Sequence, residues 1–151
     1  MTIAVVGGGG VWWNIPMGGD VNPNGYGGFK TTIWLYQDNV AATQTAVALL
    51  IQGDAARQGN PVPYTGSIIG IVVVSNEART AGTLTVDATV AGTVTGLQAV
   101  LDGTNTTVKA TTQAKDLDTF TAGQLIGCKI TTTGTWTPIT ADIIVGVTIE
   151  Y

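Results

Sequence analysis

The sequence predicts an all-β protein: an antiparallel β-sandwich, jelly-roll-like, of about eight strands, with an extended glycine-rich N-terminal arm. Three observations lead to this prediction. Apolar and polar residues alternate with a period of two in short segments spaced roughly ten residues apart. Glycine, asparagine and aspartate separate these segments, as turns require. No strand-then-helix pattern repeats along the chain, which argues against a parallel sheet.

The arm and the sandwich differ in composition. The chain of 151 residues has the length of one domain with a short appendage. Nine of its 21 glycines fall within residues 1–30, and turn signals between apolar segments begin only after them. We therefore predict an extended arm over residues 1–29 and a β-sandwich domain over residues 30–151.

Seven strands are clear from the pattern. In chain order, they cover residues 30–37, 67–75, 83–90, 93–101, 106–113, 124–132 and 142–150. Residues 67–75 are almost continuously apolar, which is typical of a strand buried on both faces. Residues 106–113 alternate Val108 and Ala110 with polar side chains. Ala91 and Gly92 lie between two strands and predict a hairpin turn.

Two of these strands have a well-defined apolar face. In residues 83–90 the inward residues are predicted to be Leu84, Val86, Ala88 and Val90, with Thr83, Thr85, Asp87 and Thr89 facing outward. In residues 142–150 the inward residues are predicted to be Ile143, Val145, Val147 and Ile149.

Two segments are ambiguous. Residues 39–53 could form an amphipathic helix or a strand from Thr45 to Ile51. We favour the strand, because Val47, Leu49 and Ile51 recur at every second position and Gly53 follows. Residues 113–120 could form a short helical turn.

The residue types exclude most catalytic chemistry. Histidine is absent, which removes histidine-dependent triads and metal sites. The single cysteine, Cys128, lies on an apolar face without a nearby base and is predicted to be a core residue. The four glycines at residues 7–10 match neither nucleotide-binding pattern. We expect no catalytic residue, no cofactor and no metal.

The carboxylates give the remaining enzymatic alternative, a glycan hydrolase. Asp116 and Asp118 lack the rest of a calcium loop and predict a solvated turn. The acids available for such a hydrolase are Asp87, Asp116, Asp118 and Asp142. None of them follows an apolar pattern that would raise its pKa for general-acid catalysis.

Charge and hydropathy also limit the partners. The net charge is −4, and the six basic residues are scattered, so no basic stripe is available for nucleic acid. The apolar runs are shorter than the roughly 20 residues of a membrane-spanning helix. The N-terminus lacks the positive charge of a secretory signal. We expect a soluble protein that binds neither nucleic acid nor membrane.

The tryptophans fall into two classes. Trp34 and Trp136 lie in or beside predicted strands and are expected in the core or at a sheet edge. Trp12 and Trp13 lie in the glycine-rich arm, where no predicted element would bury them. Large exposed aromatic side chains are typical anchors of protein interfaces. The apolar residues before the glycines could add a strand to another sheet. The predicted partner-binding residues are Ile3, Val5, Val6, Trp12 and Trp13.

From residue 34 to the C-terminus the chain resembles the small β-sandwich module of structural proteins of tailed bacteriophages. The matching features are a strand ending in Ser75-Asn76, the sequence ARTAGTLTV that follows, a turn over residues 122–127, and a loop at residues 136–138. The resemblance is to auxiliary capsid proteins, called decoration or cement proteins, and also to modules of tail or fibre proteins.

The resemblance implies a virion structural protein that binds the outer surface of a phage capsid and stabilises it. Its expected partners are the major capsid protein and further copies of itself, as a homotrimer whose arms reach neighbouring subunits. It would be made in the host cytoplasm and end on the capsid surface. The alternative is a tail-fibre or receptor-binding module that recognises host glycans, with Trp136 and Tyr64 in its loops.

Overall fold

The computed structural model describes residues 28–51 and 58–151. Residues 31–150 form one compact unit. In the described ranges the chain forms strands and no helix. The strands are β1 (Lys30–Gln37), β2 (Val47–Ala48), β3 (Leu50–Ile51), β4 (Asn60–Pro61), β5 (Gly66–Ser75), β6 (Leu84–Val90), β7 (Thr93–Leu101), β8 (Val108–Thr112), β9 (Asp118–Phe120), β10 (Leu125–Thr132) and β11 (Ile143–Glu150). All seven strands that were clear from the sequence are present.

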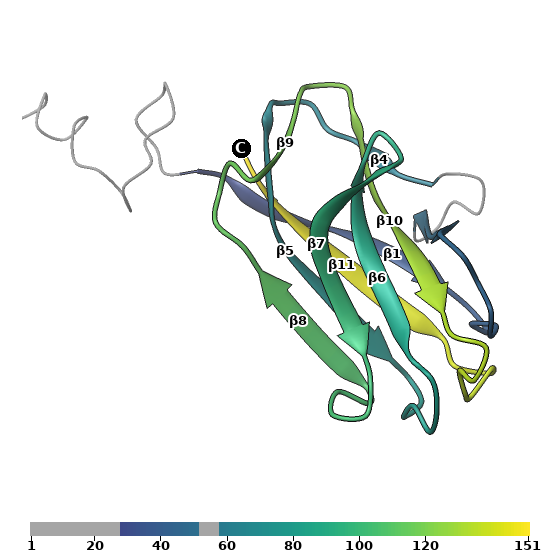
Figure 1. The fold of residues 1–151 in the computed structure, drawn as a ribbon. Coiled ribbons are helices and arrows are strands. Elements are labelled where there is room, and N and C mark those ends of the chain that lie inside the picture. Colours follow the sequence, from purple (N-terminus) through teal and green to yellow (C-terminus); the bar gives the residue numbers. More distant parts are fainter. Residues whose placement is uncertain (1–27, 52–57) are drawn as a thin grey trace, which may run out of the picture. The chain divides into compact units, whose positions relative to one another are not determined.

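The strands form two sheets packed face to face (Figure 1). The first sheet has the order β3-β1-β11-β5-β8, with β9 beside β5. The second has the order β2-β10-β6-β7, with β4 beside β10. Every pairing with a defined register is antiparallel. The predicted antiparallel sandwich is therefore confirmed.

The pairing of strands is nested along the chain. The early strand β1 lies beside the last strand β11, and β2 lies beside β10. A long ribbon of paired strands that wraps into two layers, as in jelly rolls, produces such nesting. The nesting brings residues from the beginning, middle and end of the sandwich side by side in the first sheet.

The core lies between the two sheets. The first sheet contributes Ile33, Leu35, Ile68, Ile71, Val73, Ile143, Val145, Val147 and Ile149, and the second contributes Leu84, Val86, Ala88, Leu97, Ala99, Leu101, Ile126, Cys128 and Ile130. Burial of one branched apolar side chain contributes roughly 1.5–3 kcal/mol. The predicted inward residues of β11 are all buried, and those of β6 are buried except Val90, which is half-buried.

Thr89 departs from the predicted pattern. The alternation in β6 places it on the solvent face, yet it is buried. A Cβ atom added at Gly127 would lie 2.6 Å from the carbonyl oxygen of Gln58 and 3.3 Å from the Thr89 hydroxyl. Gln58 therefore lies over this part of the outer face, and a loop that the β pattern does not predict covers Thr89.

The link between β6 and β7 is the predicted hairpin turn. Ala91 and Gly92 both adopt positive φ values, 50° and 79°. Positive φ at both central residues is the geometry of a type I′ turn, whose twist matches that of the flanking strands. The Ala91 amide donates a hydrogen bond to the Leu125 carbonyl at 2.8 Å, which attaches the turn to β10.

The ambiguous segment around Thr45–Ile51 is extended, as favoured from the sequence, but it is divided. β2 pairs with β10 in the second sheet, whereas β3 pairs with β1 in the first. The buried residue Leu49 lies between them. The segment therefore crosses from one sheet to the other. The possible helical turn at residues 113–120 is absent, and β9 forms there instead.

Candidate interaction surface

The outer face of the first sheet carries exposed apolar side chains on neighbouring strands. Ile144 of β11 is opposite Val74 of β5, and Val74 is opposite Val108 of β8. Opposed side chains on one face have Cβ atoms about 5 Å apart. These three side chains are 45%, 42% and 52% exposed, so they form an uncovered apolar row across three strands.

Trp34 of β1 adds to this face in the neighbouring row, which contains Gly146. Its indole is 47% exposed. A Cβ atom added at Gly146 of β11 would lie 2.8 Å from Cζ3 of Trp34, so the indole fills the space over this glycine. Ala110, in the next row of β8, is also exposed. We call Trp34, Val74, Val108, Ala110 and Ile144 the apolar face.

The structure corrects two sequence expectations. Trp34 does not lie in the core, because its side chain is 47% exposed. On the side of β1 away from β11, the pairing with β3 covers Leu35 and Tyr36 and does not include Trp34. The outer side of β5 is not fully buried, since Val74 is exposed. In β8 the predicted alternation is present, and its apolar residues, Val108 and Ala110, lie on the outer side of the sheet.

The outer face of the second sheet has polar rows at its centre, and it also exposes Val94 and Leu125. Asp87 of β6 is opposite Lys129 of β10 and Gln98 of β7. Thr85 is opposite Thr131 in a neighbouring row. The two outer faces of the sandwich therefore differ in chemistry. Contiguous apolar patches that remain exposed mark interaction sites more often than scattered apolar residues do.

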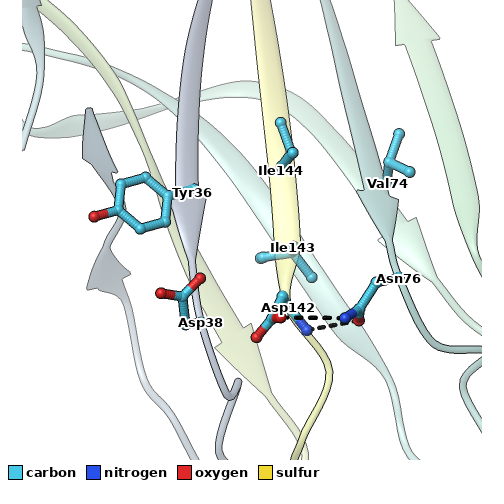
Figure 2. A pocket seen from close by; sticks show the side chains of 7 residues that line it. All are labelled: Tyr36, Asp38, Val74, Asn76, Asp142, Ile143 and Ile144. Carbon is cyan, nitrogen blue, oxygen red and sulfur yellow. Dashed lines mark hydrogen bonds between the residues drawn. The ribbon is translucent and has the colours of Figure 1, made fainter. Parts of the chain in front are cut away.

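A hollow of about 460 Å³ opens at one end of the apolar face (Figure 2). It is lined by Tyr36, Asp38, Val74, Asn76, Asp142, Ile143 and Ile144. Figure 2 shows that these side chains come from three adjacent parts of the first sheet, namely β1, β5 and β11 with their following or preceding loops. Its lining combines the apolar side chains of Val74, Ile143 and Ile144 with the carboxylates of Asp38 and Asp142.

Hydrogen bonds fix the polar end of this hollow. The Asp142 amide donates to Oδ1 of Asn76 at 2.8 Å, and Nδ2 of Asn76 donates to Oδ2 of Asp142 at 3.1 Å. The Asn39 amide donates to Oδ1 of Asp142 at 2.9 Å. These contacts join the ends of β5 and β1 to the start of β11. The Asp142 carboxylate is thereby held in one orientation.

The remaining carboxylates do not gather into a catalytic pair. Asp116 and Asp118 lie near β9, which pairs with the start of β5, whereas Asp142 lies beside the end of β5. Asp87 lies on the outer face of the other sheet. Burial raises the pKa of Asp87, which corrects the expectation that no acid has a raised pKa. Within residues 28–51 and 58–151, no group of three or more potential metal ligands occurs.

Cys128 is a core residue, as predicted. Its side chain is buried between the sheets. Burial, and secondarily the negative charge of Asp87, raise the pKa of the Cys128 thiol. The thiol is therefore neutral and inaccessible in the folded protein.

The loop tryptophan that the glycan alternative requires is buried. Trp136 is 1% exposed, and its Nε1 donates a hydrogen bond to the Val40 carbonyl at 3.0 Å. This confirms the core expectation for Trp136. Tyr64 is exposed, but it precedes β5, at the end of the sandwich opposite the loop that contains Trp136. The two aromatic residues therefore do not share a loop cluster.

The predicted arm residues Ile3, Val5, Val6, Trp12 and Trp13 lie outside the described residues. In the described part of the chain, no helix is long and apolar enough to cross a membrane. The apolar face was not predicted from the sequence. Its signal was present, because residues 67–75 and 142–150 carry apolar side chains at both odd and even positions.

Comparisons with known proteins identify similar folds. No protein-family model and no curated protein matches the chain. A chain in the solved structure of the cyanophage Pam1 capsid asymmetric unit is similar, with a TM-score of 0.51 and 17% identity over 87% of this chain and 91% of that one. A chain in the acid-stable capsid of Helicobacter pylori bacteriophage KHP30 has a TM-score of 0.51 and 8% identity, over 83% of this chain and 90% of that one. At such identities the likeness shows the fold alone.

Proposed function

We propose that the protein is a virion structural protein of a bacteriophage, which binds the outer surface of the capsid and stabilises it. The observation that carries this proposal is the likeness to chains in two phage capsid structures over most of both chains. The apolar face supports a binding role, because it is a contiguous exposed patch that crosses neighbouring strands of the first sheet. No catalytic activity is assigned to the protein.

The proposed mechanism is the burial of interface area. The sandwich domain, residues 30–151, rests on the major capsid protein. The arm, residues 1–29, reaches a neighbouring subunit, where the anchors are Ile3, Val5, Val6, Trp12 and Trp13. An extended segment of this length spans up to about 100 Å. Aromatic anchors contribute most of the binding energy in many interfaces. We propose a homotrimer as the unit that binds the capsid surface.

The arm hypothesis is tested by comparing three proteins on the same capsids. These are the full chain, a variant lacking residues 1–29, and the full chain with Trp12→Ser and Trp13→Ser. The capsids are assembled from the major capsid protein encoded in the same genome. Co-sedimentation measures occupancy, and a thermal melt of the decorated capsids measures stabilisation. Sedimentation equilibrium of the full chain measures the oligomeric state.

We expect the full chain to bind saturably and to raise the melting temperature of the capsid. Both altered proteins should bind with lower occupancy. Circular dichroism shows whether each variant keeps its β structure. Equal occupancy of all three proteins would contradict the arm hypothesis. Absence of binding by the full chain would contradict the proposed function itself.

A further inference from the structure

The apolar face ends in a hollow whose chemistry specifies what it can receive. We propose that this face docks on a protein surface that presents a lysine or arginine between apolar side chains, and that the cationic head group enters the hollow beside Asp38 and Asp142. If the proposed function holds, this surface belongs to a capsid subunit. The inference rests on that function only for the identity of the partner.

The apolar area on the outer side of the first sheet indicates that a partner covers it. β5 and β11 lie inside the first sheet, with neighbouring strands on both sides. Their inner residues fill the core, and their outer residues, Val74 and Ile144, remain exposed. Apolar residues on both sides of an interior strand are typical of sheets covered on both faces. A second layer over this sheet would bury the apolar face.

Two carboxylates place negative charge at one end of the apolar face. Asp38 is exposed, and the Asp142 carboxylate is held by Asn39 and Asn76. An ionised carboxylate offers about four acceptor positions, and the two hydrogen bonds to Asp142 use half of them. Neither carboxylate forms an ion pair with a basic residue of the described chain. The hollow can therefore accept hydrogen bonds from a cation that another molecule supplies.

The shape of the hollow suits a long side chain with an apolar stem and a cationic end. Lysine and arginine bury an apolar stem and keep a charged tip. In the hollow, such a stem would contact Ile144 and Val74, and the tip would reach the carboxylates. Tyr36 provides an aromatic ring beside this path (Figure 2). An arginine guanidinium can stack on such a ring and bind a carboxylate with two parallel hydrogen bonds.

Charge disfavours two other occupants of the hollow. Residues 1–29 contain no lysine or arginine and one acid, Asp20, so the arm lacks a basic side chain for the hollow. A second copy would bring ten acidic residues against six basic ones, so two copies with a net charge of −4 each repel one another. A foreign surface with a basic residue complements both the apolar row and the charge.

The test uses the full chain, labelled with ¹⁵N, and two short peptides as probes. One is N-acetyl-Val-Arg-Val-amide, and the other carries citrulline in place of arginine, which keeps the shape but removes the charge. Each peptide is titrated at low salt, and the backbone amides of Asp38, Asn76 and Ile144 report binding. Asp38→Asn is the test variant. Asp116→Asn, an exposed carboxylate near β9, is the matched control.

The arginine peptide should shift these amides saturably. The citrulline peptide and the Asp38→Asn variant should each weaken binding about threefold to fivefold, as expected for an exposed charge pair. The control Asp116→Asn should bind like the original chain. Equal binding of both peptides, or no saturable shift with either, would overturn the inference.

Two further outcomes would also overturn it. Shifts of the same amides with protein concentration alone would assign the face to a second copy. Shifts caused by Trp12→Ser and Trp13→Ser in the full chain would assign it to the arm. Because the peptide titration contains no capsid, its failure is separate from failure of the proposed function: a chain that binds capsids but not the arginine peptide would keep the function and lose this docking mode.

Discussion

At the scale of single residues, one end of the sandwich depends on close contact between Gly82 and Trp136. Gly82 has a φ of 74°, and a Cβ atom there would lie 2.4 Å from the Trp136 backbone nitrogen. The indole of Trp136 is buried and bonds to the Val40 carbonyl. A side chain at position 82 would therefore displace the segment that carries the tryptophan.

Replacement of Gly82 should be much more costly than replacement of a glycine in open space. Gly92 is the matched control, because its φ is 79° and a Cβ atom there meets nothing within 4 Å. Gly92→Ala should cost about 1 kcal/mol for the left-handed backbone. Gly82→Ala should cost about 3 kcal/mol, since the steric displacement is added. Urea unfolding of the two variants measures this difference, and equal losses would contradict the account of the contact.

Asp87 should make stability depend on pH. Burial raises its folded-state pKa above the ordinary value of 3.8, so ionisation disfavours the folded state. The penalty is absent below the unfolded pKa and develops as pH rises through the folded one. Asp87→Asn should therefore stabilise the protein at neutral pH and lose this advantage below about pH 3.8. Unfolding measurements across this range test the prediction.

Asp102 serves as a control for Asp87, because its pKa is shifted in the opposite direction. Backbone hydrogen bonds from Asn105 and Thr104 lower the pKa of its carboxyl group. Its ionised form therefore stabilises the fold above the unfolded pKa, and this contribution disappears as pH falls. Asp102→Asn should destabilise the protein at neutral pH. If both variants changed stability in the same direction at neutral pH, the assignment of opposite pKa shifts would be wrong.

At the scale of elements, the turn of the β6–β7 hairpin contains backbone strain at Ala91, which a substitution can relieve. Ala91 occupies a left-handed position that asparagine tolerates better. Ala91→Asn should raise the free energy of unfolding by about 0.5–1 kcal/mol. Ala114→Asn is the control, because Ala114 is exposed and has no left-handed backbone. Chemical denaturation compares the two, and an equal change in both would contradict the turn assignment.

The strands differ in how well the sequence predicts their orientation. β6 and β11 were predicted closely, because their inner residues pack in the core and most of their outer residues are polar or small. β8 follows the same alternation, but Val108 and Ala110 lie outside. Alternation separates two faces of a strand, and it does not identify the face that meets the core. That choice depends on how the sheets pack.

The division of residues 47–51 shows a second limit of the pattern. These five residues lie within one predicted strand, yet β2 and β3 belong to different sheets. The crossing at Leu49 is stabilised by a hydrogen bond from its amide to the Cys128 carbonyl at 3.0 Å. That partner is distant in sequence, so no local signal indicates the crossing.

At the scale of the whole molecule, the hollow was not predictable from the sequence. It combines residues after β1, at the end of β5 and at the start of β11. These segments become neighbours only through the nested pairing of the first sheet. The apolar character of β5 was visible in the sequence, but only the folded chain shows that Val74 on its outer side is left exposed by the described residues.

We propose that this sandwich is a structural component of a phage capsid surface. The most direct test is a cryo-electron microscopy reconstruction of capsids, assembled from the major capsid protein of the same genome, with and without the full chain. We predict additional density on the outer surface at regular lattice positions, into which the two-sheet domain fits with the apolar face toward the capsid. Identical reconstructions with and without a saturating amount of the chain would contradict this role.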